Sequence, residues 1–181
     1  MPTACVFVDT NVFVYARQAH EAEKQPVAAQ WIDRLWREQT GRTSMQVLNE
    51  CYVTLTRCFE PAPPSAVVWD YVRSLLAWNP QPVDAQVFHR AFEIGQRHRL
   101  NWWDCLIVGS AQLQGCSVLL TEDLQDGAVF GSVTVRNPFS LSVSDELAAY
   151  QPGSFEPPPH PRRGRPKRAA RPLVRQAQSR V

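Results

Sequence analysis

The sequence predicts an α/β protein with an open parallel sheet, followed by a tail that does not fold by itself. Two observations predict the sheet: short apolar runs without polar alternation, and amphipathic helical stretches that alternate with them. The tail follows from composition, because seven of the fifteen prolines lie beyond residue 151 with hardly an apolar cluster among them. We therefore expect a folded domain at 1–151 and a disordered tail at 152–181.

Four short apolar segments are the expected strands. Residues 4–8 end at Asp9 and contain no polar side chain, as a central strand covered on both faces requires. Residues 118–120 form another covered strand, 133–135 the last one, and 43–45 a short one early in the chain.

Five helices are expected between these strands, because apolar residues recur every three to four positions. Pro26 is a good first-turn residue for the first helix, and Gly41 ends its pattern. The five ranges are 26–40, 46–59, 65–77, 84–98 and 104–114.

Aromatic residues at two places are expected in the core. Phe88 and Phe92 lie on the apolar stripe of the fourth helix. Trp102 and Trp103 could stack nucleic-acid bases, but aromatic residues at the entry of a helix more often belong to the core, which is what we expect here.

Composition excludes several classes of protein. Hydrophobic residues make up 44% of the chain and charged residues 20%, which are ordinary globular values. No run of eighteen apolar residues exists, and the start of the chain lacks the basic region of a secretory signal. The five cysteines include no CxxC pair. We expect them to be reduced, buried thiols of a cytoplasmic protein without a membrane partner.

The net charge of +2 conceals a division between domain and tail. Residues 152–181 hold eight basic side chains against one acid, Glu156, so the remainder of the chain is acidic. A basic tail on an acidic body points toward a nucleic-acid partner.

Acidic residues stand where a parallel sheet places its ligand crevice, outside the carboxyl ends of the strands. Asp9 follows the first strand and Asp123 the strand at 118–120. Asp104 begins the fifth helix, and Glu50 lies a turn into the second.

Each of these acids also has a simpler interpretation. Asp9 and Asp104 could be helix caps, Asp123 turn chemistry, and Glu50 a solvated side chain. Four carboxylates in one crevice, however, would repel one another unless a cation neutralised them. A donor set made of oxygen atoms is what Mg²⁺ or Mn²⁺ selects, so the four acids together indicate a site for phosphate chemistry.

Four segments occur in the order found in one known family: 8–12 (VDTNV), 44–50 (SMQVLNE), 103–108 (WDCLIV) and 120–123 (LTED). As a set they resemble a PIN domain, specifically the VapC-type toxin ribonucleases of type II toxin-antitoxin systems, over about residues 5–138. The resemblance implies a Rossmann-like three-layer α/β/α sandwich. It also implies a metal-dependent endoribonuclease that hydrolyses structured RNA (tRNA, rRNA or mRNA) through a metal-activated water, leaving a 5′-phosphate and a 3′-hydroxyl.

The resemblance also assigns residues. The positions that match its catalytic acids are Asp9, Glu50, Asp104 and Asp123. Of these, Asp9, Asp104 and Asp123 would bind Mg²⁺ (or Mn²⁺). Thr10, Asn11 and Thr121 match accessory polar positions that would hydrogen-bond the ligands. A cognate antitoxin and a homodimer are further implications.

The tail contains a segment that looks like an AT-hook. Its candidate nucleic-acid-binding residues are Arg162, Arg163, Gly164, Arg165, Pro166, Lys167 and Arg168. Glycine permits close approach of the backbone, and arginines enter the negative potential of a narrow minor groove. A polycation that grips any phosphate backbone remains the alternative.

Two other functions compete with the ribonuclease. A haloacid-dehalogenase-like phosphohydrolase also has an aspartate after its first strand, but Asn11 stands where that class has a second aspartate, and no lysine lies between Lys24 and Lys167. In a catalytically silent nucleic-acid-binding module, the tail would do everything and the acids would only cap helices.

Overall fold

A single sheet organises the part of the chain that the computed structural model describes, residues 4–57, 59 and 61–140. Its strands are β1 (Val6–Val8), β2 (Gly41–Arg42), β3 (Val118–Leu120), β4 (Val129–Phe130) and β5 (Val133–Arg136). Their order is β2-β1-β3-β5-β4, parallel except for β4, which pairs antiparallel with β5. The expected α/β fold is confirmed, with one antiparallel edge strand that the sequence did not predict.

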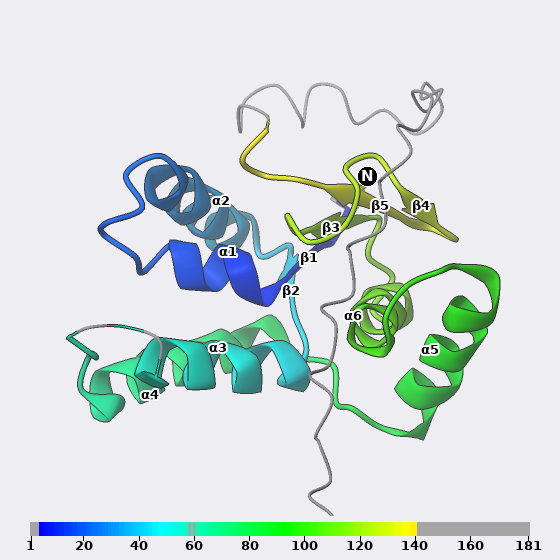
Figure 1. The fold of residues 1–181 in the computed structure, drawn as a ribbon, viewed down its shortest axis with the longest axis horizontal. Coiled ribbons are helices and arrows are strands. Elements are labelled where there is room, and N and C mark those ends of the chain that lie inside the picture. Colours follow the sequence, from blue (N-terminus) through cyan, green and yellow to red (C-terminus); the bar gives the residue numbers. More distant parts are fainter. Residues whose placement is uncertain (1–3, 58, 60, 141–181) are drawn as a thin grey trace, which may run out of the picture.

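Helices cover both faces of this sheet, as Figure 1 shows. They are α1 (Thr10–Tyr15), α2 (Lys24–Glu38), α3 (Met45–Arg57), α4 (Ser65–Ser74), the 3₁₀ turn η1 (Leu75–Trp78), α5 (Ala85–Arg97) and α6 (Trp102–Leu113). The first four helices lie on one side, while α5 packs on α6, which in turn contacts β3 and β5. The three layers enclose one apolar core whose fully buried members include Phe7, Phe13, Leu35, Leu106 and Leu119.

The parallel pairing of β1 with β3 sets up one polar edge of the sheet. Val8 is the register partner of Leu120, and the amide of Asp9 donates to the Leu120 carbonyl at 3.1 Å. The residues that follow these two strands therefore emerge side by side. We call this side of the sheet the carboxyl edge.

The short strand expected at residues 43–45 is wrong in position. The strand lies at Gly41–Arg42, and Ser44 instead forms a single bridge with Gln81. The backbone after Arg42 has turned toward the segment that leads into α5, since Met45 donates to the Gln81 carbonyl at 2.9 Å. The pairing of β1 with β2 therefore ends at Arg42, shortly before α3 begins.

The expectation of a buried aromatic stripe on α5 is also wrong. Val87, Ala91 and Ile94 face the core, whereas Phe88 and Phe92 are 49% and 60% exposed. Successive residues of a helix point about 100° apart, so each phenylalanine has rotated off the face that its neighbour buries.

Trp102 and Trp103 are likewise not core residues. Their exposed fractions are 40% and 63%. The helix begins earlier than expected, at Trp102, because the Asn101 side chain accepts from the amide of Asp104 at 2.9 Å and caps it. Both indoles therefore occupy the first turn, ahead of the buried stripe that starts at Cys105.

Three of the cysteines, Cys51, Cys105 and Cys116, are buried free thiols, whereas Cys5 is only half-buried. Cys58, the expected domain boundary and the tail at 152–181 lie outside the described residues. Within those residues, every helix is too short or too polar to cross a lipid bilayer.

We predict that Gly41→Ala destabilises the protein. A Cβ atom at Gly41 would lie 2.6 Å from the indole of Trp78, which is buried against Phe13 and Trp36. Because that ring is held by its neighbours, the free energy of unfolding should fall by about 1–3 kcal/mol in urea denaturation.

Gly95→Ala is the matched control for this substitution. A Cβ atom there meets only the Cys105 sulfur at 3.5 Å, an ordinary contact, inside α5. Alanine is the better helix former by up to about 1 kcal/mol, so this variant should be as stable as the parent or more so. Equal stability of both variants would contradict the steric argument.

Candidate active site

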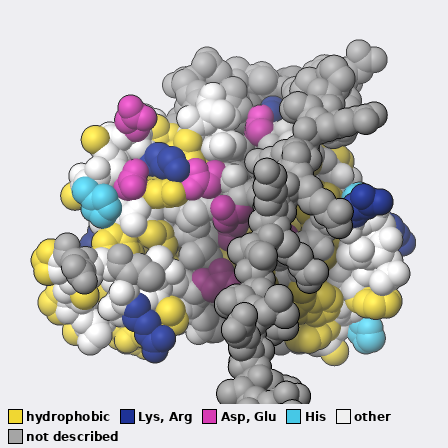
Figure 2. Space-filling model, viewed as in Figure 1, with side chains coloured by type: hydrophobic (Ala, Val, Ile, Leu, Met, Phe, Trp, Pro, Cys, Tyr) yellow, Lys and Arg dark blue, Asp and Glu magenta, His cyan; other side chains and the backbone are white. Residues whose placement is uncertain are grey.

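Four acidic side chains face one another across the carboxyl edge of the sheet. Asp9 follows β1, Asp123 follows β3, Glu50 lies on α3, and Asp104 lies in the first turn of α6. We call these four residues the acidic site. Figure 2 shows acidic side chains gathered in the middle of the face viewed. The structure therefore brings together residues that are up to 114 positions apart in the sequence.

The hydroxyl of Thr121 is the centre of a hydrogen-bond network at this site. It donates to Asp9 Oδ2 at 2.8 Å and accepts from the Asn11 side-chain amide at 3.0 Å. Asn11 also donates to Asp123 Oδ2 at 3.1 Å. Because Thr121 is fully buried, this network fixes two carboxylates against the end of the sheet.

Glu50 is held by a second pair of donors. Thr10 donates its hydroxyl to Glu50 Oε2 at 3.0 Å, and Gln46 donates its amide to Glu50 Oε1 at 3.0 Å. Gln46 is buried one helical turn before Glu50, which points the carboxylate toward α1. Each of the three polar residues that the resemblance singled out thus hydrogen-bonds an acid of the site.

Asp104 is positioned from its own helix. Its carboxylate accepts from the Asn101 side-chain amide at 2.6 Å, while Asn101 in turn caps the Asp104 amide. Asp104 is therefore not the N-cap, and its half-buried carboxylate lies in the first turn. Asp9, by contrast, is the N-cap of α1, since its Oδ1 accepts from Thr10 N at 2.7 Å.

Burial and the mutual repulsion of the carboxylates raise the pKa of two members of the acidic site. Burial raises the pKa of Asp9 from 3.8 to about 6, and the charges of Asp123 and Glu50 add to that rise against the hydrogen bonds from Thr121 and Thr10. Burial and the same two charges also raise the pKa of Asp104. The site accumulates more negative charge than the surrounding protein neutralises.

The donor chemistry of the site fits Mg²⁺ or Mn²⁺. Asn11 Oδ1 is buried and accepts no hydrogen bond within the described part of the chain, while the amide of the same side chain donates to the Asp123 carboxylate. An unsatisfied oxygen beside carboxylates is the kind of ligand that a hard cation prefers. In residues 4–57, 59 and 61–140, no three acidic, histidine or cysteine side chains are grouped closely enough to hold a metal ion.

The chain matches a known protein family. Among protein families, the PIN domain matches residues 6–125. The chain belongs to the PIN domain family. The match spans Asp9, Glu50, Asp104 and Asp123 and ends just beyond Asp123.

One solved structure similar to this PIN domain is the toxin VapC20 of Mycobacterium tuberculosis, described as cleaving the sarcin-ricin loop. The two share 24% sequence identity with a TM-score of 0.49, over 63% of this chain and 86% of the other. Comparison with curated proteins gave no match.

Three site features escaped the sequence analysis. Gln46 and Asn101 hold the carboxylates of Glu50 and Asp104, and a signal existed for each, because they stand four and three residues before the acid on the same helical face. Lys24 was missed as a neighbour. It pairs with Glu122, adjacent to Asp123, at 2.6 Å and lies over the ring of Tyr15, so its charge is already engaged.

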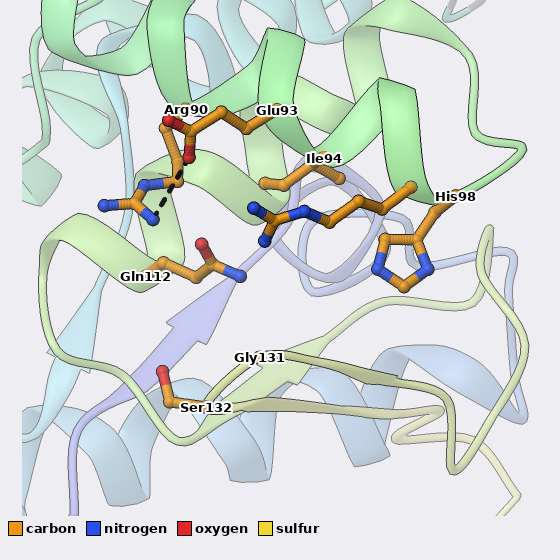
Figure 3. A pocket seen from close by; sticks show the side chains of 8 residues that line it. Arg90, Glu93, Ile94, His98, Gln112, Gly131 and Ser132 are labelled. Atoms are coloured by element: carbon orange, nitrogen blue, oxygen red, sulfur yellow. Dashed lines mark ion pairs between the residues drawn. The ribbon is translucent and has the colours of Figure 1, made fainter.

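A separate cavity of about 290 Å³ lies beside the amino end of β5, away from the acidic site. Figure 3 shows Arg90, Glu93, His98 and Ser132 around it, together with the side chain of Gln112. The ring of His98 packs edge-on against Phe130 at 5.0 Å. This histidine therefore serves packing at the opposite end of the sheet.

We predict a pH dependence of stability that originates at Asp9 in metal-free protein. The folded-state pKa of Asp9, about 6, lies above the unfolded value near 3.8, so the folded state holds the extra proton between these values. Raising the pH through this window should therefore lower the free energy of unfolding, by up to about 3 kcal/mol from this group.

Asp9→Asn removes the titration, so the variant should gain stability relative to the parent as the pH rises from about 4 to 7. Urea denaturation at several pH values, with a chelator present, measures the difference. A stability difference that stays constant across this range would contradict the origin assigned to Asp9.

Proposed function

We propose that this PIN domain is a metal-dependent endoribonuclease and the toxin of a type II toxin-antitoxin pair. The observation that carries the proposal is the convergence of four carboxylates from four different elements in a chain of the PIN family. A haloacid-dehalogenase-like phosphohydrolase is not favoured, because the chain matches the PIN domain family. In addition, the hydrogen-bond network described above around Asp9 contains no lysine or arginine.

The residues of the chain would divide the work at the scissile phosphodiester. Asp9, Asp104 and Asp123 would hold the metal, with Glu50 facing the same space and orienting the attacking water by accepting a hydrogen bond. A bound Mg²⁺ or Mn²⁺ would supply charge neutralisation and a lowered pKa of water. Thr10, Asn11 and Thr121 would keep the carboxylates aimed inward, since a small displacement of catalytic groups costs much of the rate.

The proposed setting is cytoplasmic, with structured RNA as substrate, a cognate antitoxin that blocks the site, and a homodimer as the assembly. The acidic body would repel RNA by itself, because residues 1–151 carry sixteen acidic against eleven basic side chains. The basic tail would offset that repulsion by holding nucleic acid near the carboxyl edge.

We predict that purified protein cuts total RNA in the presence of Mg²⁺ or Mn²⁺, and that Asp9→Asn and Asp104→Asn each abolish cutting. Each substitution removes a carboxylate that the metal needs while preserving the size of the side chain. Asp33→Asn is the matched control, because this exposed acid pairs with Arg37 on α2 and should leave cutting unchanged.

Assaying p-nitrophenyl phosphate in parallel separates the competing functions. Release of phosphate from this small ester would favour a phosphohydrolase. Inertness toward both substrates with retained RNA binding would favour a silent module. RNA cutting that persists after chelation, or in both aspartate variants, would refute the proposed mechanism.

We further predict that deleting residues 152–181 weakens RNA binding and flattens its dependence on salt. Each lost contact between a basic side chain and a phosphate should reduce the slope of log K against log salt by about 0.7–0.9. The proposed binding of Mg²⁺ should survive, because the acidic site lies in the other part of the chain. An unchanged salt slope would contradict a role of the tail in binding.

A further inference from the structure

Exposed aromatic side chains, which we call the aromatic surface, lie on α5 and in the first turn of α6, the turn that also carries Asp104 of the acidic site. Its members are Phe88 and Phe92 on α5 and Trp102 and Trp103 at the start of α6, with exposed fractions between 40% and 63%. Phe88 and Trp102 contact each other edge to face, with ring centroids 5.6 Å apart. Large aromatic side chains are seldom left in solvent together, and such a patch usually marks a binding surface.

Folding does not require these four rings. The first turn of α6 is fixed by Asn101, whose side chain caps the helix independently of either indole. The interface between α5 and α6 is already filled by smaller side chains, with Ala91 and Cys105 fully buried and Gly109 against Arg90. The rings therefore add exposed area without adding to the core, which is a cost unless something binds them.

Trp103 is adjacent to the proposed chemistry. It directly precedes Asp104, and consecutive Cα atoms lie about 3.8 Å apart, so the indole and the carboxylate leave the helix from neighbouring positions. A phosphate at the acidic site has its own base one sugar away. The two side chains point about 100° apart around the helix, so the exposed indole borders the acidic site and does not enter it.

A basic side chain precedes the aromatic residues of α6. Arg99 is exposed in the segment between α5 and α6, three residues before Trp102, and forms no ion pair among the residues described, whereas Arg97 lines the cavity beside the amino end of β5. Aromatic rings beside arginines are the combination that single strands bind, because bases stack on the rings while cations meet the phosphates.

We propose that the aromatic surface binds unpaired bases of the RNA that flank the cleaved phosphodiester, with Trp103 as the main stacking residue. This inference rests on the proposed function. It gives that function a preference for single-stranded or splayed segments of structured RNA, because the π face of a base is inaccessible inside a helix. Trp102, which contacts Phe88, provides the second ring of the same surface.

Binding of a short single-stranded RNA to the full chain, with a chelator to prevent cutting, tests the inference. Trp103→Ala should raise the Kd by a factor between about five and about a hundred. The salt slope should stay unchanged, because stacking releases no counterions. Trp103→Phe should restore most of the affinity, since it keeps an aromatic face.

Two controls separate stacking from other causes. Trp69→Ala removes another exposed tryptophan, 53% exposed on α4 against 63% for Trp103, and should leave the Kd unchanged. The same RNA strand annealed into a duplex should lose little affinity on Trp103→Ala. A Kd unaffected by Trp103→Ala, an equal loss for duplex, or dissociation of a dimer in place of the loss of RNA would each overturn the inference.

The assay also separates this inference from the nuclease itself, since it needs neither metal nor cutting. Trp103-dependent binding by a protein that cuts no RNA would refute the proposed function and support the stacking surface. RNA cutting together with unchanged RNA binding by Trp103→Ala would refute the stacking surface and support the proposed function.

Discussion

Negative charge crowded at the carboxyl edge of β1 and β3 is the constraint on which the site depends. Burial and neighbouring charges push the pKa of Asp9 up to about 6, even though Thr121 and Thr10 both donate to it. Hydrogen bonds from neutral donors can orient carboxylates, but they do not neutralise them. The fold therefore holds an electrostatic cost that a divalent cation would relieve.

The same groups that shape the site also hold the fold together. Asp9 caps α1 while facing Asp123, and the buried hydroxyl of Thr121 joins the end of β1 to the residues after β3. Asp9 therefore belongs both to the cap of α1 and to the acidic site. A substitution at Asp9 alters both together.

The errors of the sequence analysis share one physical cause. Hydrophobic periodicity shows that α5 is amphipathic, but Phe88 and Val87 differ by one position, and only packing against α6 decides which of them faces inward. Likewise, the residues after Gly41 have strand-like composition, yet the bridge from Ser44 to Gln81 draws the backbone away from β1. Local patterns carry no information about which distant segment will compete for a hydrogen bond.

Sequence by itself determined the alternation of strands and helices, the acids at strand ends and the division of charge between body and tail, because these follow from local composition and spacing. It also supplied the order of motifs that marks the family. Only the tertiary structure decided that Thr121 links Asp9 to Asn11, that Thr10 holds Glu50, and that packing of the helices leaves Trp103 in solvent. Those facts depend on contacts between residues far apart in the chain, which form only when β1 and β3 pair and the helices pack over them.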